Sequence, residues 1–149
     1  MTLVRPAVAA DLDAMLALYR HLNDEDPPPD PAAATQAWDA LIGSDLATVL
    51  VAEDAGRIAA SCTLVIVPNV MRLARPYALI ENVVTHADHR RRGLGRAVVE
   101  EAIRRADAAG CYKVMLATGA RSPGVIEFYE SVGMIRTGKT FFEVRRPLR

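Results

Sequence analysis

The chain has 149 residues, a length that suits one compact domain and is too short for two ordinary ones. Its 18 basic and 18 acidic side chains give a formal net charge of zero, so it has no bulk positive charge for binding a nucleic acid. No apolar run approaches the roughly 20 residues that span a bilayer, and the first residues lack a signal-peptide core. We therefore expect a single domain over residues 1–149, soluble and cytoplasmic, with no nucleic-acid or membrane partner.

The N-terminal part of the chain predicts a short strand and two helices. Residues 2–4 are the strand candidate, and apolar residues then recur on one helical face over residues 10–22. Residues 23–30 contain four acidic side chains and three consecutive prolines, which excludes a helix and favours an exposed loop. Asp30 and Pro31 are the residue types of an N-cap and a first helical position, so a second helix is expected to begin there.

The middle of the chain predicts antiparallel strands. Residues 48–53 and 57–67 are rich in β-branched and aliphatic side chains, and residues 54–56, Asp-Ala-Gly, form a turn signal between them. These two segments should pair as a hairpin. A connection over residues 68–76 then leads into a further strand at residues 77–85.

The rest of the chain predicts a helix, a strand, a helix and a closing strand. An amphipathic helix is expected over residues 95–109, followed by a compact strand over residues 112–118. Ser122-Pro123 begins a last helix that ends at Gly133, and residues 140–144 close the sheet. The predicted order, β-α-α-β-β-β-α-β-α-β, indicates an α/β fold with a mixed sheet and helices on its faces.

A basic loop that contains glycine, residues 89–96, joins the strand 77–85 to the helix 95–109. Glycines let the backbone approach a ligand closely, and the unpaired N–H groups of a helix N-terminus favour an anion such as phosphate. A dinucleotide-binding fingerprint does not fit, because Val98 stands where it needs a small residue, and the Gly-Lys-Ser/Thr of a P-loop is absent. From these residues alone, a solvated turn at residues 90–92 is an equally good interpretation.

Two motifs resemble those of a known family. Arg90-x-x-Gly93-x-Gly95, preceded by the strand residues 80–85 and followed by an amphipathic helix, resembles the acetyl-CoA signature of the GNAT superfamily of N-acetyltransferases. Residues 128–134, Phe-Tyr-Glu-Ser-Val-Gly-Met, resemble the second cofactor motif of that family, F-Y-x-x-x-G-F/M. The resemblance implies the GNAT fold, which is a mixed, mostly antiparallel sheet with splayed central strands and helices on both faces.

The resemblance also implies how acetyl-CoA binds. Pantetheine would insert between the strands 77–85 and 112–118, and N–H groups from residues 91–97 would surround the pyrophosphate. Many members carry Asn after the second of these strands, where this chain has Thr118-Gly119. The implied cofactor-binding residues are Val83, Val84, Thr85, Arg90, Arg91, Arg92, Gly93, Leu94, Gly95, Arg96, Ala97 and Thr118.

Glu81 is the candidate general base, since many family members have a glutamate here that removes a proton from the attacking amine. It lies two residues before Val83, hence on the same face of a regular strand, in a mainly apolar run that would raise its pKa. The alternative is a structural carboxylate paired with an arginine such as Arg57 or Arg72.

Tyr129 is the candidate acid, because it matches the family tyrosine that reaches the sulfur of coenzyme A. Its hydroxyl would protonate the departing thiolate. The alternative is core packing beside Val125 and Val132 on the same helix.

The two cysteines are expected to be small buried hydrophobes. Cys62 and Cys111 do not form a C-x-x-C pair and do not lie near a histidine cluster, so no metal site is predicted. Neither matches a nucleophile position, which favours direct transfer of the acetyl group in a ternary complex.

The resemblance implies that an acceptor amine would contact the segments 23–30 and 68–76. The first is acidic and the second carries Arg72 and Arg75, so amino acids, amino sugars and polyamines all remain open. Acetyl transfer to a small-molecule amine is the predicted function. Acetylation of a protein amine and a non-catalytic acyl-CoA sensor are the alternatives, and the resemblance is compatible with a homodimer.

Overall fold

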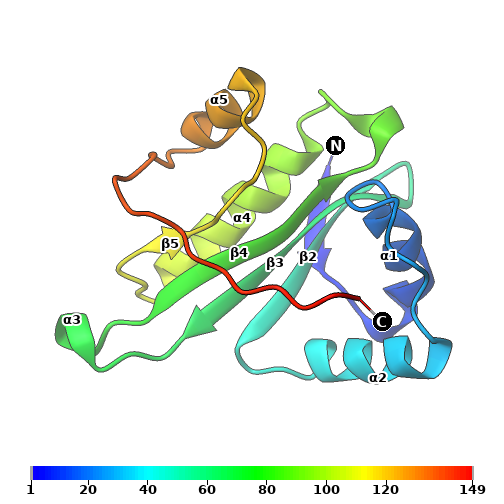
Figure 1. Ribbon diagram of the computed structural model, residues 1–149, viewed down its shortest axis with the longest axis horizontal. Coiled ribbons are helices and arrows are strands. Elements are labelled where there is room, and N and C mark those ends of the chain that lie inside the picture. Colours follow the sequence, from blue (N-terminus) through cyan, green and yellow to red (C-terminus); the bar gives the residue numbers. More distant parts are fainter. Residues whose placement is uncertain (1, 149) are drawn as a thin grey trace. The chain divides into compact units, whose positions relative to one another are not determined.

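The computed structural model describes residues 2–148, which divide into a larger unit that ends at Leu116 and a smaller one that begins at Ala117. The larger unit contains all five strands (Figure 1). The strands are β1 (Leu3–Pro6), β2 (Ala47–Asp54), β3 (Arg57–Val67), β4 (Tyr77–Thr85) and β5 (Val114–Met115). The helices are α1 (Leu12–Tyr19), α2 (Pro31–Ile42), α3 (Met71–Ala74), α4 (Leu94–Ala108) and α5 (Pro123–Ser131), with 3-10 turns at Ala9–Asp11 and Ala87–His89.

The five strands form one mixed sheet in the order β1-β2-β3-β4-β5. All neighbours are antiparallel except β4 and β5, which are parallel. The predicted α/β class and mostly antiparallel sheet are therefore confirmed. Within residues 2–148, β4 pairs with β5 only at Ala78↔Val114 and Leu79↔Met115, so the edge of β4 beyond Leu79 has no strand bonded to it. This is the splayed pair that the resemblance implied.

Helices cover both faces of the sheet (Figure 1). On one face, Val49, Val51 and Val84 pack against Met15 of α1 and Trp38 of α2. Because side chains alternate along a strand, the neighbouring positions point to the other face, where α4 packs on β2, β3 and β4. The buried residues of that second face are Leu50, Ala52, Ala60, Cys62, Leu64 and Ile80, with Val98, Val99 and Ala102 of α4.

A side-chain cap marks the start of α2, and a backbone turn marks the end of α1. Asp30 caps α2 by accepting a hydrogen bond of 3.0 Å from the N–H of Ala33, as predicted. The first helix is shorter than the predicted 10–22, because a tight turn follows Tyr19 in which Leu22 N–H donates to Tyr19 O at 3.0 Å. In the described part of the chain, the helices are all too short or too polar to cross a membrane.

Both cysteines are buried, as expected. The Cys62 thiol is fully buried on the α4 face and donates to the carbonyl oxygen of Val98 at 3.4 Å. Burial raises the pKa of Cys62 to about 12, so the thiol stays protonated at neutral pH.

Two predictions for the C-terminal part are corrected. The strand predicted at 112–118 is only two residues long, Val114–Met115. The strand predicted at 140–144 is wrong, because residues 132–148 contain neither helix nor strand. A strand needs a neighbour for its backbone hydrogen bonds, and no strand pairing is formed by this segment in the described residues, where Phe141 is 67% and Phe142 88% exposed.

Candidate active site

A β-bulge interrupts β4 at Asn82. Ser61 of β3 lies opposite Val84 and Thr63 lies opposite Glu81, so two residue steps on β3 match three on β4. Asn82 takes up the extra residue with a left-handed φ of 53°, which asparagine tolerates better than most residues. The bulge lies on the strand whose other edge is open, so it re-aims side chains where a ligand can reach the backbone.

The bulge also changes which residues share a face with Glu81. Ser61 and Thr63 alternate with Cys62, whose thiol touches α4, so they face α1. Glu81 therefore faces α1 together with Val84, and the expected alignment with Val83 is wrong. The Glu81 side chain is also exposed. The expectation that apolar groups surround it is therefore wrong.

The environment of Glu81 contains hydroxyl groups and no arginine partner among residues 2–148. Arg72 lies over the Tyr112 ring, 5.8 Å from its centre, and Arg57 lines a cavity described below. Tyr19 of α1 lies beside Thr63, and burial raises the pKa of Tyr19, so its hydroxyl is protonated at neutral pH. The hydroxyl of Ser61 is fully buried and has no hydrogen-bond partner in the described part of the chain.

The glycine loop forms a turn with its backbone exposed. Arg91 has a left-handed φ of 61°, and Gly93, the N-cap of α4, has a φ of 80°. Only glycine adopts the second conformation without strain, and nothing lies within 4 Å of the position that a Cβ would take there. The loop therefore presents open backbone next to the N–H groups of the first turn of α4.

The four arginines of the loop differ in their partners. Arg92 is paired with Asp54 of β2 at 2.6 Å, and Arg96 with Glu100 at 2.7 Å. Arg90 and Arg91 are exposed, and neither forms an ion pair within residues 2–148. The positive charge available to an anion at this loop is therefore mainly that of Arg90 and Arg91.

Asp54 also holds a second residue of the loop. Its Oδ2 lies 2.8 Å from Nδ1 of His89, a hydrogen bond in which the imidazole donates because a carboxylate only accepts. The same oxygen accepts from Arg92, so one carboxylate at the tip of the β2–β3 hairpin fixes both sides of the loop.

The other two histidines of the chain hold the 3-10 turn that leads into the loop. His86 Nδ1 accepts from the N–H of Asp88 at 3.2 Å, and His21 Nδ1 accepts from the N–H of Ala87 at 3.3 Å. The two rings lie 4.0 Å apart between centres. In the described residues, no three His, Cys, Asp or Glu side chains are grouped so that they could hold a metal ion.

Tyr129 and Thr118 lie in the smaller unit, which begins at Ala117. Tyr129 is half-buried on α5, with its ring edge-to-face against Phe128 at 5.0 Å between centres. The hydroxyl of Thr118 accepts from the N–H of Ala120 at 3.2 Å.

The two segments expected to contact an acceptor differ in exposure and in their hydrogen bonds to the rest of the fold. Residues 23–30 are exposed throughout, whereas Arg75 is tied to the core, with its guanidinium donating to the carbonyls of Gly110 and Cys111 at 3.0 and 3.2 Å. Arg75 therefore serves as a structural link in this conformation. Arg72 remains exposed on the turn before β4.

The structure brings Glu81, the backbone of residues 83–85 and the loop 90–97 together along one strand and the helix that follows it. Sequence reasoning missed Asp54, His86 and His21. The pair His86 and His89, which comes just before an arginine run, was an available signal for side-chain capping of this segment. His21 offered no signal, because its bond to Ala87 spans 66 residues of sequence.

Comparisons with known proteins agree with this geometry. Residues 15–134 match the model of the acetyltransferase (GNAT) family. Glucosamine 6-phosphate N-acetyltransferase of Trypanosoma brucei brucei is 33% identical over 83% of this chain and 82% of that protein. Glucosamine 6-phosphate N-acetyltransferase 1 of Oryza sativa subsp. japonica is 33% identical over 89% and 80%. A solved structure, "Putative acetyltransferase from Agrobacterium tumefaciens str. C58", is 46% identical, covers 97% of this chain and 99% of that one, and has a TM-score of 0.92.

Proposed function

The chain belongs to the acetyltransferase (GNAT) family, and from this premise we propose how its residues carry acetyl groups from acetyl-CoA to a small-molecule primary amine. The observation that carries the proposal is the open edge of β4 beside the bulge at Asn82. Glu81 lies at one end of this edge, and the glycine loop, a type of loop that can bind phosphate, follows its other end. Donor, acceptor and base can meet along this edge.

The donor binds as an added strand would. The backbone of Val83, Val84 and Thr85 bonds pantetheine along the unpaired edge, in the manner of an extended peptide that joins a sheet. The N–H groups of residues 91–97 and the guanidinium groups of Arg90 and Arg91 bind the pyrophosphate. Arg92 shapes the loop through its ion pair with Asp54, Arg96 pairs with Glu100 within α4, and Thr118 is a further pantetheine contact.

The reaction is direct attack in a ternary complex. The amine nitrogen attacks the thioester carbonyl, the carbon–sulfur bond breaks, and the product is an amide with free coenzyme A. An alkylammonium with a pKa near ~10.4 is less than about 0.1% free base at pH 7, equivalent to roughly 4–5 kcal/mol of barrier. Glu81 takes the proton from nitrogen, directly or through a water molecule, and the N–H groups near Val83 and Val84 stabilise the oxyanion. Tyr129 gives a proton to the leaving sulfur.

For the acceptor, we favour an amino sugar or an amino sugar phosphate. The support comes from the two relatives described above, which are named glucosamine 6-phosphate N-acetyltransferases. The exposed acidic loop that contains Asp24, Glu25 and Asp26 would attract the ammonium form of such an amine.

The test is steady release of thiol from acetyl-CoA with a panel of amines. Glucosamine 6-phosphate, glucosamine, several amino acids, two polyamines and a lysine-containing peptide cover the open classes. We expect turnover with at least one small amine, and more with the amino sugars than with the peptide. Acetyl-CoA binding in a calorimeter together with silence across the panel would support the sensor alternative.

Assembly and location complete the proposal. By the family resemblance we propose a homodimer, and from the sequence a cytoplasmic location. Light scattering after size-exclusion chromatography tests the first, since a particle of twice the chain mass supports it and a particle of one chain mass contradicts it. Fractionation of cells that produce the untagged chain tests the second.

A further inference from the structure

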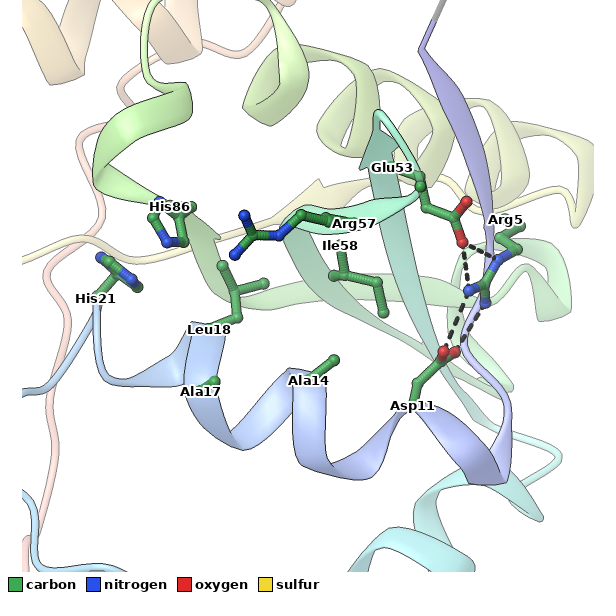
Figure 2. A pocket seen from close by; sticks show the side chains of 11 residues that line it. Arg5, Asp11, Ala14, Ala17, Leu18, His21, Glu53, Arg57, Ile58 and His86 are labelled. Atoms are coloured by element: carbon green, nitrogen blue, oxygen red, sulfur yellow. Dashed lines mark hydrogen bonds and ion pairs between the residues drawn. The ribbon is translucent and has the colours of Figure 1, made fainter.

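A cavity of about 350 Å³ opens on the α1 side of the sheet, within the larger unit (Figure 2). It lies between α1, the start of β3 and the residue that follows β4. Its size is within the range of small-molecule sites, about 300–1,000 Å³. Its lining residues are Arg5, Asp11, Ala14, Ala17, Leu18, His21, Glu53, Gly56, Arg57, Ile58 and His86. Neither Glu81 nor any residue of β5 is among them, so it is distinct from the open edge of β4.

In the part of the chain that the structure describes, not every charged side chain of the cavity wall has an ion-pair partner. Arg5 donates to Glu53 at 2.8 Å and to Asp11 at 2.8 Å, so both carboxylates of the wall are already used by one guanidinium. Arg5 correspondingly lowers the pKa of Asp11, which keeps this carboxylate ionised. Arg57 has no ion pair within the described residues, and its side chain extends toward His86 (Figure 2). One positive charge of the wall is therefore left without a partner.

Two imidazoles add donors beside Arg57. His21 and His86 each accept a backbone N–H at Nδ1, so in the neutral state the proton of each ring is on Nε2. Each ring therefore has an N–H to donate while it still holds the turn before the loop. The carboxylate of Asp88 lies 3.9 Å from Nδ1 of His86 and is 87% exposed, so it faces water.

The rest of the wall is apolar. Ala14, Ala17 and Leu18 of α1 form one side, and Ile58 of β3 lies across from them (Figure 2). A cavity with convergent donors at one end and aliphatic side chains along its length suits a ligand that has a negative head and a short apolar body.

We propose that this cavity binds a small organic anion, a carboxylate or a phosphate monoester, whose charged group pairs with Arg57 and accepts from His21 and His86 while its aliphatic part lies against α1. The site is separate from the acetyl-transfer site and does not depend on the proposed activity. Because His21 and His86 also hold the 3-10 turn that leads into the glycine loop, an occupant would stiffen that turn.

The test uses imidazole NMR of the full chain at constant pH and ionic strength. The chain has 3 histidines, so their signals can all be assigned by substitution. The probes are acetate, butyrate and inorganic phosphate, with chloride as the reference anion. We expect saturable shifts of His21 and His86, with butyrate binding about tenfold more tightly than acetate because each buried methylene contributes about 0.8 kcal/mol.

Variants locate the binding. Arg57→Gln should weaken every probe about tenfold or more, since it removes a charged hydrogen-bond donor. Arg20→Gln, which removes another exposed arginine, at the C-cap of α1, is the matched control and should change nothing. Ala14→Leu fills the cavity without a change of charge and should abolish binding.

Several results would overturn the proposal. One is the absence of saturable shifts, and another is equal affinity in Arg57→Gln and Arg20→Gln. Retention of binding in Ala14→Leu would put the anion on the outer surface of Arg57. Shifts of His89 alone would put it on the glycine loop, where aliphatic length should not matter. Phosphate binding without any gain from acetate to butyrate would reduce the site to a surface anion contact.

Discussion

Ile80 and Glu81 are neighbours in sequence and lie on opposite faces of the sheet. Ile80 is 1% exposed and lies among buried apolar side chains on the face that packs against α4. Glu81 is exposed on the α1 face, among hydroxyl groups and beside the bulge. One face of the strand thus packs in the core, and the other holds the base in our proposal, so substitutions on the two faces should separate rate from stability.

The largest expected effect is on rate, from Glu81→Gln. We expect the acetylation rate at neutral pH to fall about 10²–10⁴-fold, which is the usual contribution of a general base. The free energy of unfolding should change by less than about 0.5 kcal/mol, because the side chain is exposed. Thiol release from neutral to alkaline pH measures the first and urea unfolding the second. A full rate with an unchanged alkaline profile would remove Glu81 from the mechanism.

Ile80→Ala should have the opposite pattern. Truncation at a fully buried position leaves a cavity and should cost about 2–5 kcal/mol of unfolding free energy. The rate per folded molecule should be nearly unchanged at low temperature. Leu3→Ala is the control, because Leu3 is 57% exposed and should lose little stability. A loss of rate in the folded Ile80 variant would contradict the division between the faces.

Asp54→Asn extends the comparison to the end of the sheet. The Asp54 carboxylate is 25% exposed and holds His89 and Arg92, so it positions the loop without touching the donor in our proposal. We expect about a fivefold rise in KM for acetyl-CoA with little change in kcat, as loss of roughly 1 kcal/mol of charged hydrogen bonding predicts.

Glu100→Gln is the matched control for Asp54→Asn. It breaks the pair of Arg96 and Glu100, whose side chains are 48% and 49% exposed, and exposed pairs contribute little, about twofold at most in affinity. Equal effects of the two variants on KM would mean that Asp54 has no special role.

A smaller effect concerns pH. Burial, with His21 as the next cause, lowers the pKa of His86, and Asp88 acts in the opposite direction. The unfolded chain therefore takes up a proton at a higher pH than the folded chain, so stability should fall as the pH drops below about 6.5, the ordinary pKa of histidine. His86→Asn keeps an acceptor for the Asp88 N–H and removes the titration. Urea unfolding above and below that pH should show a smaller decrease in unfolding free energy in the variant when the pH is lowered. An equal decrease in both proteins would contradict the assignment of this effect to His86.

The smallest effect is expected from Ser61→Ala. The Ser61 hydroxyl is buried without a partner in the described residues, so its removal should cost nothing and can gain up to about 1 kcal/mol. Ala60→Ser makes the reverse change on the α4 face, where Ala60 is fully buried, and should cost about 1–3 kcal/mol. Equal changes in unfolding free energy for the two variants, measured by thermal or urea unfolding, would contradict this difference between the two faces.

Local signals account for the parts of the fold that were predictable. The strand 77–85 and the hairpin around residues 54–56 were predicted because β-branched runs and a turn sequence act over a few residues. The predicted strand at 140–144 failed because a strand depends on a partner far away in sequence. The left-handed turn at Arg72 and Leu73, with φ of 55° and 60°, has no glycine or asparagine to announce it.

The site was predictable to a similar extent. The motif around Gly93 and Gly95 located the loop, since glycine spacing is a property of the sequence itself. The partners of its arginines were not, because Asp54 reaches Arg92 only once the hairpin is folded beside it. The bulge at Asn82 was also missed, and with it the face on which Glu81 lies.

The unpaired edge of β4 also affects the tendency of the protein to aggregate. An open strand edge is a template for pairing with another chain, and so an aggregation hazard. A donor bound along that edge as we propose would cover it and, at a concentration of about 100 times its Kd, add about 2.7 kcal/mol of stability by mass action. The concentration of acetyl-CoA would then affect both the amount of folded protein and the acetylation rate. A shortage of acetyl-CoA would lower both.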